Sequence, residues 1–123
     1  MIQHQILEDE GILVVSPTEK LSAEDFTGLA AAVDPYIEAH GGLQGLLIDA
    51  ESFPGWEDFA GFTSHMRFVK DHHKVIARVA LATDAAIPGF APKLVDHFTA
   101  AEIRAFPYAE RDAALAWLRG GGG

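Results

Sequence analysis

The stretch Gly45-Leu46-Leu47-Ile48-Asp49-Ala50 decides the fold class of this chain. It is too short for a helix and almost wholly apolar, which is typical of a strand that is covered on both faces of a sheet. We therefore expect Leu47 and Ile48 to be buried on opposite faces. Val75–Ala82 is a second apolar run, and Glu102–Phe106 is a third, weaker one. Helical segments fill the intervals, and this alternation predicts parallel strands joined by right-handed crossovers.

The N-terminal part predicts a hairpin followed by a helix. Two apolar runs, Ile2–Leu7 and Ile12–Val15, flank a short polar turn that ends in a glycine, which is typical of an antiparallel pair. Ser22 can cap the helix that follows, Pro35 should kink or tighten it, and His40-Gly41-Gly42 should end it. Its apolar residues fall within about 100° of arc and predict one buried stripe: Phe26, Leu29, Val33, Tyr36 and Ile37.

Three more helices are expected, at residues 56–72, from Pro92 to about Thr99, and at Ala109–Leu118. In the first of these, Phe68 lies opposite the apolar stripe that we expect to face the core, which consists of Phe59, Phe62, Met66 and Val69. The predicted order is ββαβαβαβα, an α/β domain over residues 1–119 with a mixed sheet. The glycines at 120–123 should form a flexible tail.

Charge and composition restrict the function. The 123 residues hold 18 acidic and 9 basic side chains, and the net charge of −9 argues against nucleic acid or an anionic membrane as a partner. Residues 1–58 hold 12 acids and one base, so the acidity belongs to the first half. It reflects either acids at helix starts and turns or an acidic docking face. No cysteine is present, which excludes disulfides and thiolate metal sites. With no membrane-spanning stretch or signal segment, we expect a cytoplasmic protein without membrane insertion.

Several segments resemble a known family. Val33-Asp34-Pro35-Tyr36-Ile37, the strand from Gly45 to Ala50, Phe53-Pro54-Gly55-Trp56-Glu57-Asp58 and Asp71-His72-His73 are similar to the SpoIIAA-like family of small bacterial proteins. The resemblance covers nearly the whole chain. It implies a βα superhelical fold shared with STAS domains, which include anti-sigma-factor antagonists, and with lipid-binding CRAL-TRIO domains. It does not imply an activity.

One departure from the regulatory STAS pattern concerns phosphorylation. Regulatory members carry a phosphorylatable serine in an Asp-Ser-Ser-Gly-like stretch where the helix after the central strand begins, so that a phosphate alters a docking face. Here the corresponding stretch is Glu51-Ser52-Phe53-Pro54-Gly55-Trp56, with no Ser-Gly pair. Ser52 precedes the helix by several residues. This argues against a phosphorylation switch, and the anti-sigma-antagonist role does not carry over with it.

Metal and catalytic motifs are weak. His65 and His72 are seven residues apart, about 10 Å along a helix, whereas helical zinc ligands are commonly four apart. We therefore interpret these two and His73 as structural, with a ligand contact as the alternative, and expect no metal and no cofactor. No serine lies in a nucleophile elbow, and no phosphate loop or dinucleotide fingerprint is present. Five carboxylates offer acid/base chemistry or magnesium binding as an alternative to capping helices: Asp49, Glu51, Glu57, Asp58 and Asp84.

The candidate binding site lies at the carboxyl ends of the strands, where open α/β sheets bind ligands. Segments 49–56 and 83–92 leave these ends and carry large apolar residues, which are unusual in loops. We predict that the two loops lie side by side and bind a ligand or partner; the alternative is that they cap the end of the sheet. The candidate residues are Asp49, Glu51, Phe53, Trp56, Asp84, Ile87 and Phe90.

Together these observations predict a non-enzymatic binding or regulatory module that takes a protein partner and allows a homodimer. The alternative is a carrier of a small apolar or lipid-like ligand, as in CRAL-TRIO domains, and the third candidate is an enzyme. A carrier requires an enclosed apolar pocket under Trp56 and Phe90, and a docking module requires an exposed flat patch. An enzyme requires a cleft in which Asp49, Asp84 or His65 converge.

Overall fold

The computed structural model describes residues 2–51, 58–72, 75–84 and 102–120. Five strands form one sheet in the order β1-β2-β3-β4-β5, in which β1 is antiparallel to β2 and all other neighbours are parallel. This confirms the mixed sheet with an N-terminal hairpin. The strands are β1 (Ile2–Leu7), β2 (Ile12–Pro17), β3 (Leu43–Asp49), β4 (Ile76–Ala82) and β5 (Glu102–Phe106).

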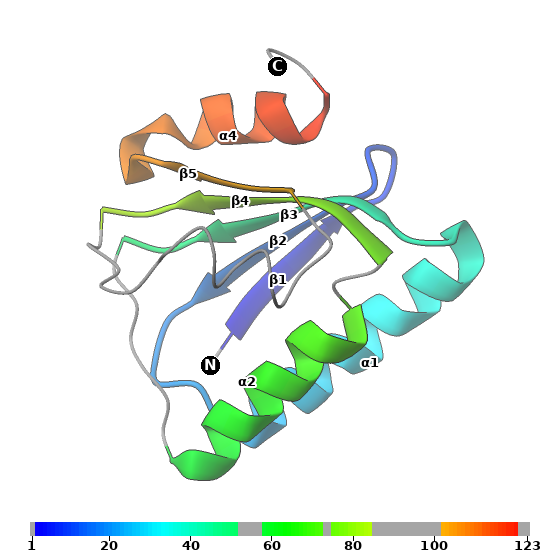
Figure 1. Ribbon diagram of the computed structural model, residues 1–123, viewed down its shortest axis with the longest axis vertical. Helices are drawn as coiled ribbons and strands as arrows, with labels where there is room; N and C mark the ends of the chain where they lie inside the picture. Colours follow the sequence, from blue (N-terminus) through cyan, green and yellow to red (C-terminus); the bar gives the residue numbers. More distant parts are fainter. Residues whose placement is uncertain (1, 52–57, 73–74, 85–101, 121–123) are drawn as a thin grey trace.

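Helices cover both faces of the sheet (Figure 1). The helices α1 (Ala23–His40) and α2 (Phe59–His72) lie side by side on one face. The other face is covered by α4 (Arg111–Leu118), which follows the 3-10 turn η2 (Tyr108–Glu110). The helix expected from Pro92 to Thr99 lies outside the described residues, as does most of the glycine tail.

The central strand β3 separates two hydrophobic clusters. Leu47 is completely buried in the cluster under α4, together with Trp117 and Leu118. Leu46 belongs to the cluster under α1, where Ile48 is only half-buried. The prediction of two buried residues on opposite faces is therefore confirmed for Leu47, while Ile48 retains some exposure because it lies near the end of its strand.

Helix α1 begins and ends as its sequence predicts. The Ser22 hydroxyl accepts a hydrogen bond from the Asp25 amide at 3.3 Å, and the Asp25 carboxylate accepts one from the Ser22 amide at 2.9 Å. Burial acts to raise the pKa of Asp25, but the Ser22 hydrogen bonds together with a nearby positive charge hold this pKa below its ordinary value. The helix runs through Pro35 and ends at Gly41, whose φ of +84° favours glycine. All five residues of the predicted stripe are buried or half-buried.

Helix α2 turns a different face to the core from the one predicted. Phe68 packs into the cluster under α1, although its position opposite the apolar stripe had placed it outward. In contrast, Phe59 is 77% exposed and Met66 is 39% exposed. The assignment of Phe59 and Met66 to the core is therefore wrong, while the side chains of Phe62 and Val69 lie outside the described part of the chain.

A glycine and two histidines explain this orientation. A Cβ atom on Gly61 would lie 2.4 Å from the Leu21 carbonyl oxygen, so only glycine allows α2 this close to the chain before α1. The His65 ring stacks on Phe26 with 4.9 Å between centroids. The buried His72 ring stacks on Phe68, and its nitrogens lie 2.7 Å from the Phe68 carbonyl oxygen and 2.6 Å from an Asp34 carboxylate oxygen. Aromatic stacking and hydrogen bonds of Phe68, His65 and His72 thus form the contact of α2 with α1.

The packing of His65 predicts an acid-sensitive contact between α1 and α2. Burial lowers the pKa of His65 below its ordinary value of 6.5, so the unfolded chain binds this proton more readily than the folded one. The stabilising contribution is complete above about pH 6.5 and is lost as pH falls below it toward the lowered pKa. We expect His65→Phe, which keeps an aromatic ring on Phe26, to lose less stability than the wild type between pH 7.5 and pH 5.5 in urea melts. An equal loss in both proteins would contradict this.

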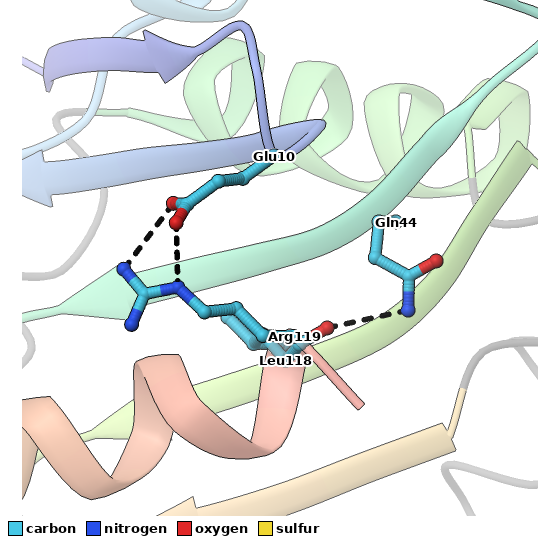
Figure 2. A network of polar contacts seen from close by, with 4 residues as sticks. All are labelled: Glu10, Gln44, Leu118 and Arg119. Carbon is cyan, nitrogen blue, oxygen red and sulfur yellow. Dashed lines mark hydrogen bonds and ion pairs between the residues drawn. The ribbon is translucent and has the colours of Figure 1, made fainter. Parts of the chain in front are cut away.

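The C-terminus of α4 fastens the N-terminal hairpin to the sheet (Figure 2). The Arg119 guanidinium makes two contacts with the Glu10 carboxylate, of 2.7 Å and 3.2 Å. The Gln44 side-chain amide donates to the Leu118 carbonyl oxygen at 3.3 Å. Because Glu10 lies in the turn between β1 and β2, these contacts hold the hairpin turn, β3 and α4 together.

Candidate functional site

The carboxyl ends of β3 and β4 lie next to each other and are joined beyond the last strand residues. Asp49 is paired in register with Ala82. The Ala50 amide then donates to the Ala82 carbonyl oxygen at 3.1 Å. The Glu51 carbonyl oxygen accepts from the Asp84 amide at 3.1 Å and from the Thr83 hydroxyl at 3.2 Å. Residues 50–51 and 82–84 are thus joined by hydrogen bonds, and we call them the joined stem. The two segments predicted to form the site both start from it.

Asp49 forms an ion pair with the last helix. One of its carboxylate oxygens lies 3.4 Å from Nη1 of Arg111, the first residue of α4. The Asp49 side chain is only 12% exposed, whereas that of Arg111 is 47% exposed. The carboxylate therefore faces inward to a cation, and the guanidinium is the part of this pair that a ligand can reach.

Asp84 binds the backbone of the segment between β5 and α4. Its Oδ1 accepts a hydrogen bond from the Tyr108 amide at 3.0 Å, and the neighbouring Thr83 amide donates to the Phe106 carbonyl oxygen at 3.0 Å. Tyr108 itself is 37% exposed. The ends of β3, β4 and β5 are therefore connected by the polar groups of residues 50–51, 83–84 and 106–108.

Three of the seven predicted site residues can be placed. Asp49, Glu51 and Asp84 meet at this edge of the sheet, as expected from the parallel strands. The Glu51 and Asp84 side chains are exposed. The four apolar candidates, Phe53, Trp56, Ile87 and Phe90, lie outside the described residues, so their place in the site stays a prediction.

Sequence reasoning missed Arg111 and Tyr108. Both follow β5, and a site built only from the ends of β3 and β4 leaves out the third parallel strand. The available signal was the position of Arg111 at the start of the last helix: a helix after a parallel strand begins at the carboxyl edge of the sheet, so its first residues face the same site.

The other chemical candidates do not join this edge. His65 and His72 face α1 from α2, and His73 lies outside the described residues. Asp58 lies just before α2, where its Oδ1 accepts from the Gly61 amide at 2.9 Å, a helix-capping contact. Among residues 2–51, 58–72, 75–84 and 102–120, no group of three histidine or acidic side chains could hold a metal ion. In that same part of the chain, no helix has the length and hydrophobicity to cross a membrane.

Comparisons with known proteins agree on the fold. The SpoIIAA-like family model matches residues 12–119. A solved structure of an uncharacterized DUF3478-family protein with a SpoIIAA-like fold, from Shewanella loihica PV-4, is similar with a TM-score of 0.68. It is 20% identical, and the match covers 96% of this chain and 92% of that one. No curated protein matches the chain.

Proposed function

Because the chain belongs to the SpoIIAA-like family, we propose that it is a non-enzymatic binding or regulatory module of the STAS-like type. The proposed contact surface comprises residues 52–56 and 87–90 together with the exposed side chains of Arg111 and Tyr108.

The joined stem at the carboxyl edge carries this proposal. The Glu51 carbonyl oxygen binds both Thr83 and Asp84, so the two loops begin within hydrogen-bonding distance of each other. Large apolar side chains that start from one rigid stem are suited to form a single contact surface, because little ordering of the stem is needed on binding. Their apolar residues are Phe53, Trp56, Ile87 and Phe90.

The contacts of the Asp49 and Asp84 carboxylates support a binding function more than acid/base catalysis. Asp49 is turned inward to Arg111, and Asp84 holds the Tyr108 amide. Both carboxylates therefore already have a structural role, whereas a general base must reach the proton that it removes. The Glu51 side chain remains exposed next to this edge, which favours a protein partner with cationic or amphipathic character.

Truncating Trp56 tests the proposed surface. Native mass spectrometry of protein purified from its source first identifies what binds, and the Kd of that molecule is then measured with variants. We expect Trp56→Ala to weaken binding at least about 30-fold, because a tryptophan often dominates a contact that excludes water. Met66→Ala, on the outer face of α2, is the matched control and should bind like the wild type.

Two results decide against this surface. If Trp56→Ala lowers the stability in urea melts yet leaves the Kd unchanged, Trp56 belongs to the core and the site lies elsewhere. If the co-purifying molecule is a small apolar compound rather than a protein, the carrier alternative replaces the docking module.

A further inference from the structure

Strand β1 lies at one edge of the sheet and carries no charged side chain. Among the described residues, no strand pairs with it on the side away from β2. The sheet ends at β1, which pairs there only with β2 (Figure 1). The three central side chains, Gln3, His4 and Gln5, are exposed, and Ile2 is half-buried. The unpaired N–H and C=O groups of such a strand can pair with another chain.

This edge lacks the features by which proteins usually protect an edge strand, namely charges, proline and bulges. Residues 2–7 contain no charged side chain and no proline, and their register with β2 is continuous from Ile2 to Leu7. The opposite edge is different: β5 carries Glu102 and Arg104, and Pro107 follows it. In the part of the chain that the structure describes, the unprotected edge is thus on the β1 side of the sheet.

The hairpin that carries this edge is held in place before any partner arrives. The Tyr36 hydroxyl donates to the Glu8 carbonyl oxygen at 2.9 Å. The Glu10 carboxylate is held by Arg119 on the other side of the sheet (Figure 2). A strand fixed at its turn from both faces loses little conformational freedom when it pairs, which favours association.

We propose that the partner of this edge is β1 of a second copy of the chain, paired antiparallel about a two-fold axis. The proposal goes beyond the loop surface and does not depend on it. Each chain carries a net charge of −9, with 12 acids in residues 1–58, so most contacts between copies would bring like charges together. None of those acids lies in β1, where two copies can meet without this repulsion.

The alternation of side chains sets the register. Directly opposite residues of an antiparallel pair point to the same face of the sheet. The two-fold axis must therefore place one residue of β1 opposite its own copy, and it cannot pass between two successive residues of the strand. An axis at His4 pairs Ile2 with the partner's Ile6, Gln3 with the partner's Gln5, and His4 with the partner's His4. This register matches apolar with apolar side chains and amide with amide side chains, and it uses the whole exposed segment. The carboxyl edges of the two sheets then point in opposite directions, so a dimer presents two separate loop surfaces.

Engineered cysteines test the register, because the chain has no cysteine of its own. In the proposed dimer, the Cα atoms of the two residues at position 4 are about 4.5–5.5 Å apart, within disulfide range. The two residues at position 3 are about 8 Å apart, which is too far. We expect mild oxidation of His4→Cys to give a covalent species of twice the 13.2 kDa chain mass under denaturing conditions, whereas Gln3→Cys gives no covalent dimer. Equal cross-linking of the two variants, or of neither, would overturn the register.

Sedimentation of lysine variants tests the interface itself. We expect a wild-type dimer, and we expect His4→Lys to raise its Kd at least about 100-fold because two lysines then face each other. Met66→Lys adds the same charge to the exposed face of α2 and should leave the dimer intact. Gln5→Lys is a second edge variant, and circular dichroism checks that each variant is folded. A monomeric wild type, a stable His4→Lys dimer or a dimer lost only in Met66→Lys would each refute the proposal.

Discussion

Replacing Leu47 with alanine is expected to lower the free energy of unfolding by about 2–5 kcal/mol, the usual cost of emptying a leucine site in a core. Leu47 is completely buried between the middle of the sheet and α4. Its neighbours Ala80 and Ala114 are small, so they have few side-chain atoms that can move into the space left by the leucine. Urea denaturation monitored by circular dichroism measures the loss.

Ile48→Ala is the matched control for Leu47→Ala. Ile48 follows Leu47 on the same strand and points to the other face, where it is half-buried. We expect a smaller loss than for Leu47, below about 2 kcal/mol, because part of the side chain already contacts water. If the two losses are equal, or if Leu47→Ala costs less than about 1 kcal/mol, the central position of this strand is wrong.

The sheet could be predicted from the sequence because its signals are local and strong. The runs at Ile12–Val15 and Gly45–Ala50 are apolar over lengths that suit strands, and Ser22 and Gly41 mark the ends of α1. Parallel order then follows from the alternation with helices. Family resemblance led to the same fold, and the family match over residues 12–119 confirms it.

The orientation of α2 could not be predicted in this way because hydrophobicity was the wrong measure. Gly61 contributes no side chain to a hydrophobic stripe, yet its missing Cβ brings the helix against Leu21. His65 and His72 count as polar, yet their rings stack on Phe26 and Phe68. Leu21 and Phe26 precede Gly61 and His65 by about 40 positions, and Asp34, which contacts His72, precedes it by 38. Only the His72–Phe68 pair is local, because both residues lie on α2.

The candidate site was predictable only where it depends on the sheet. Asp49 and Asp84 end neighbouring parallel strands, so their meeting at one edge follows from topology. The interaction partners of these residues do not follow from topology. Arg111 and the Tyr108 amide reach them from a segment whose position is set by the packing of α4.

Replacing Trp117 with alanine is expected to cost about 3–5 kcal/mol, the range for emptying a large aromatic site. Trp117 is 4% exposed and packs against Phe106 with 6.1 Å between ring centroids. The Arg78 guanidinium carbon lies 5.0 Å from the centroid of the Trp117 ring, and Nη1 of Arg78 donates to the Trp117 carbonyl oxygen at 2.6 Å. Removing the ring therefore opens a cavity and also removes the cation–π contact of Arg78. A loss below about 1 kcal/mol in urea melts would show that α4 adds little to the core.

Trp117→Phe separates the cavity from the cation–π contact and connects stability with function. Phenylalanine refills most of the site, so we expect a loss of stability well below that of Trp117→Ala, with the remainder due to the smaller ring facing Arg78.

The chain has two tryptophans, so the Trp117→Phe variant leaves Trp56 as the only one. Its fluorescence then reports on the loop at residues 52–56 alone. A shift on adding the binding partner to Trp117→Phe, with the fold intact by circular dichroism, is the expected result if that loop forms the contact surface; an unchanged spectrum at saturating partner would place the contact elsewhere.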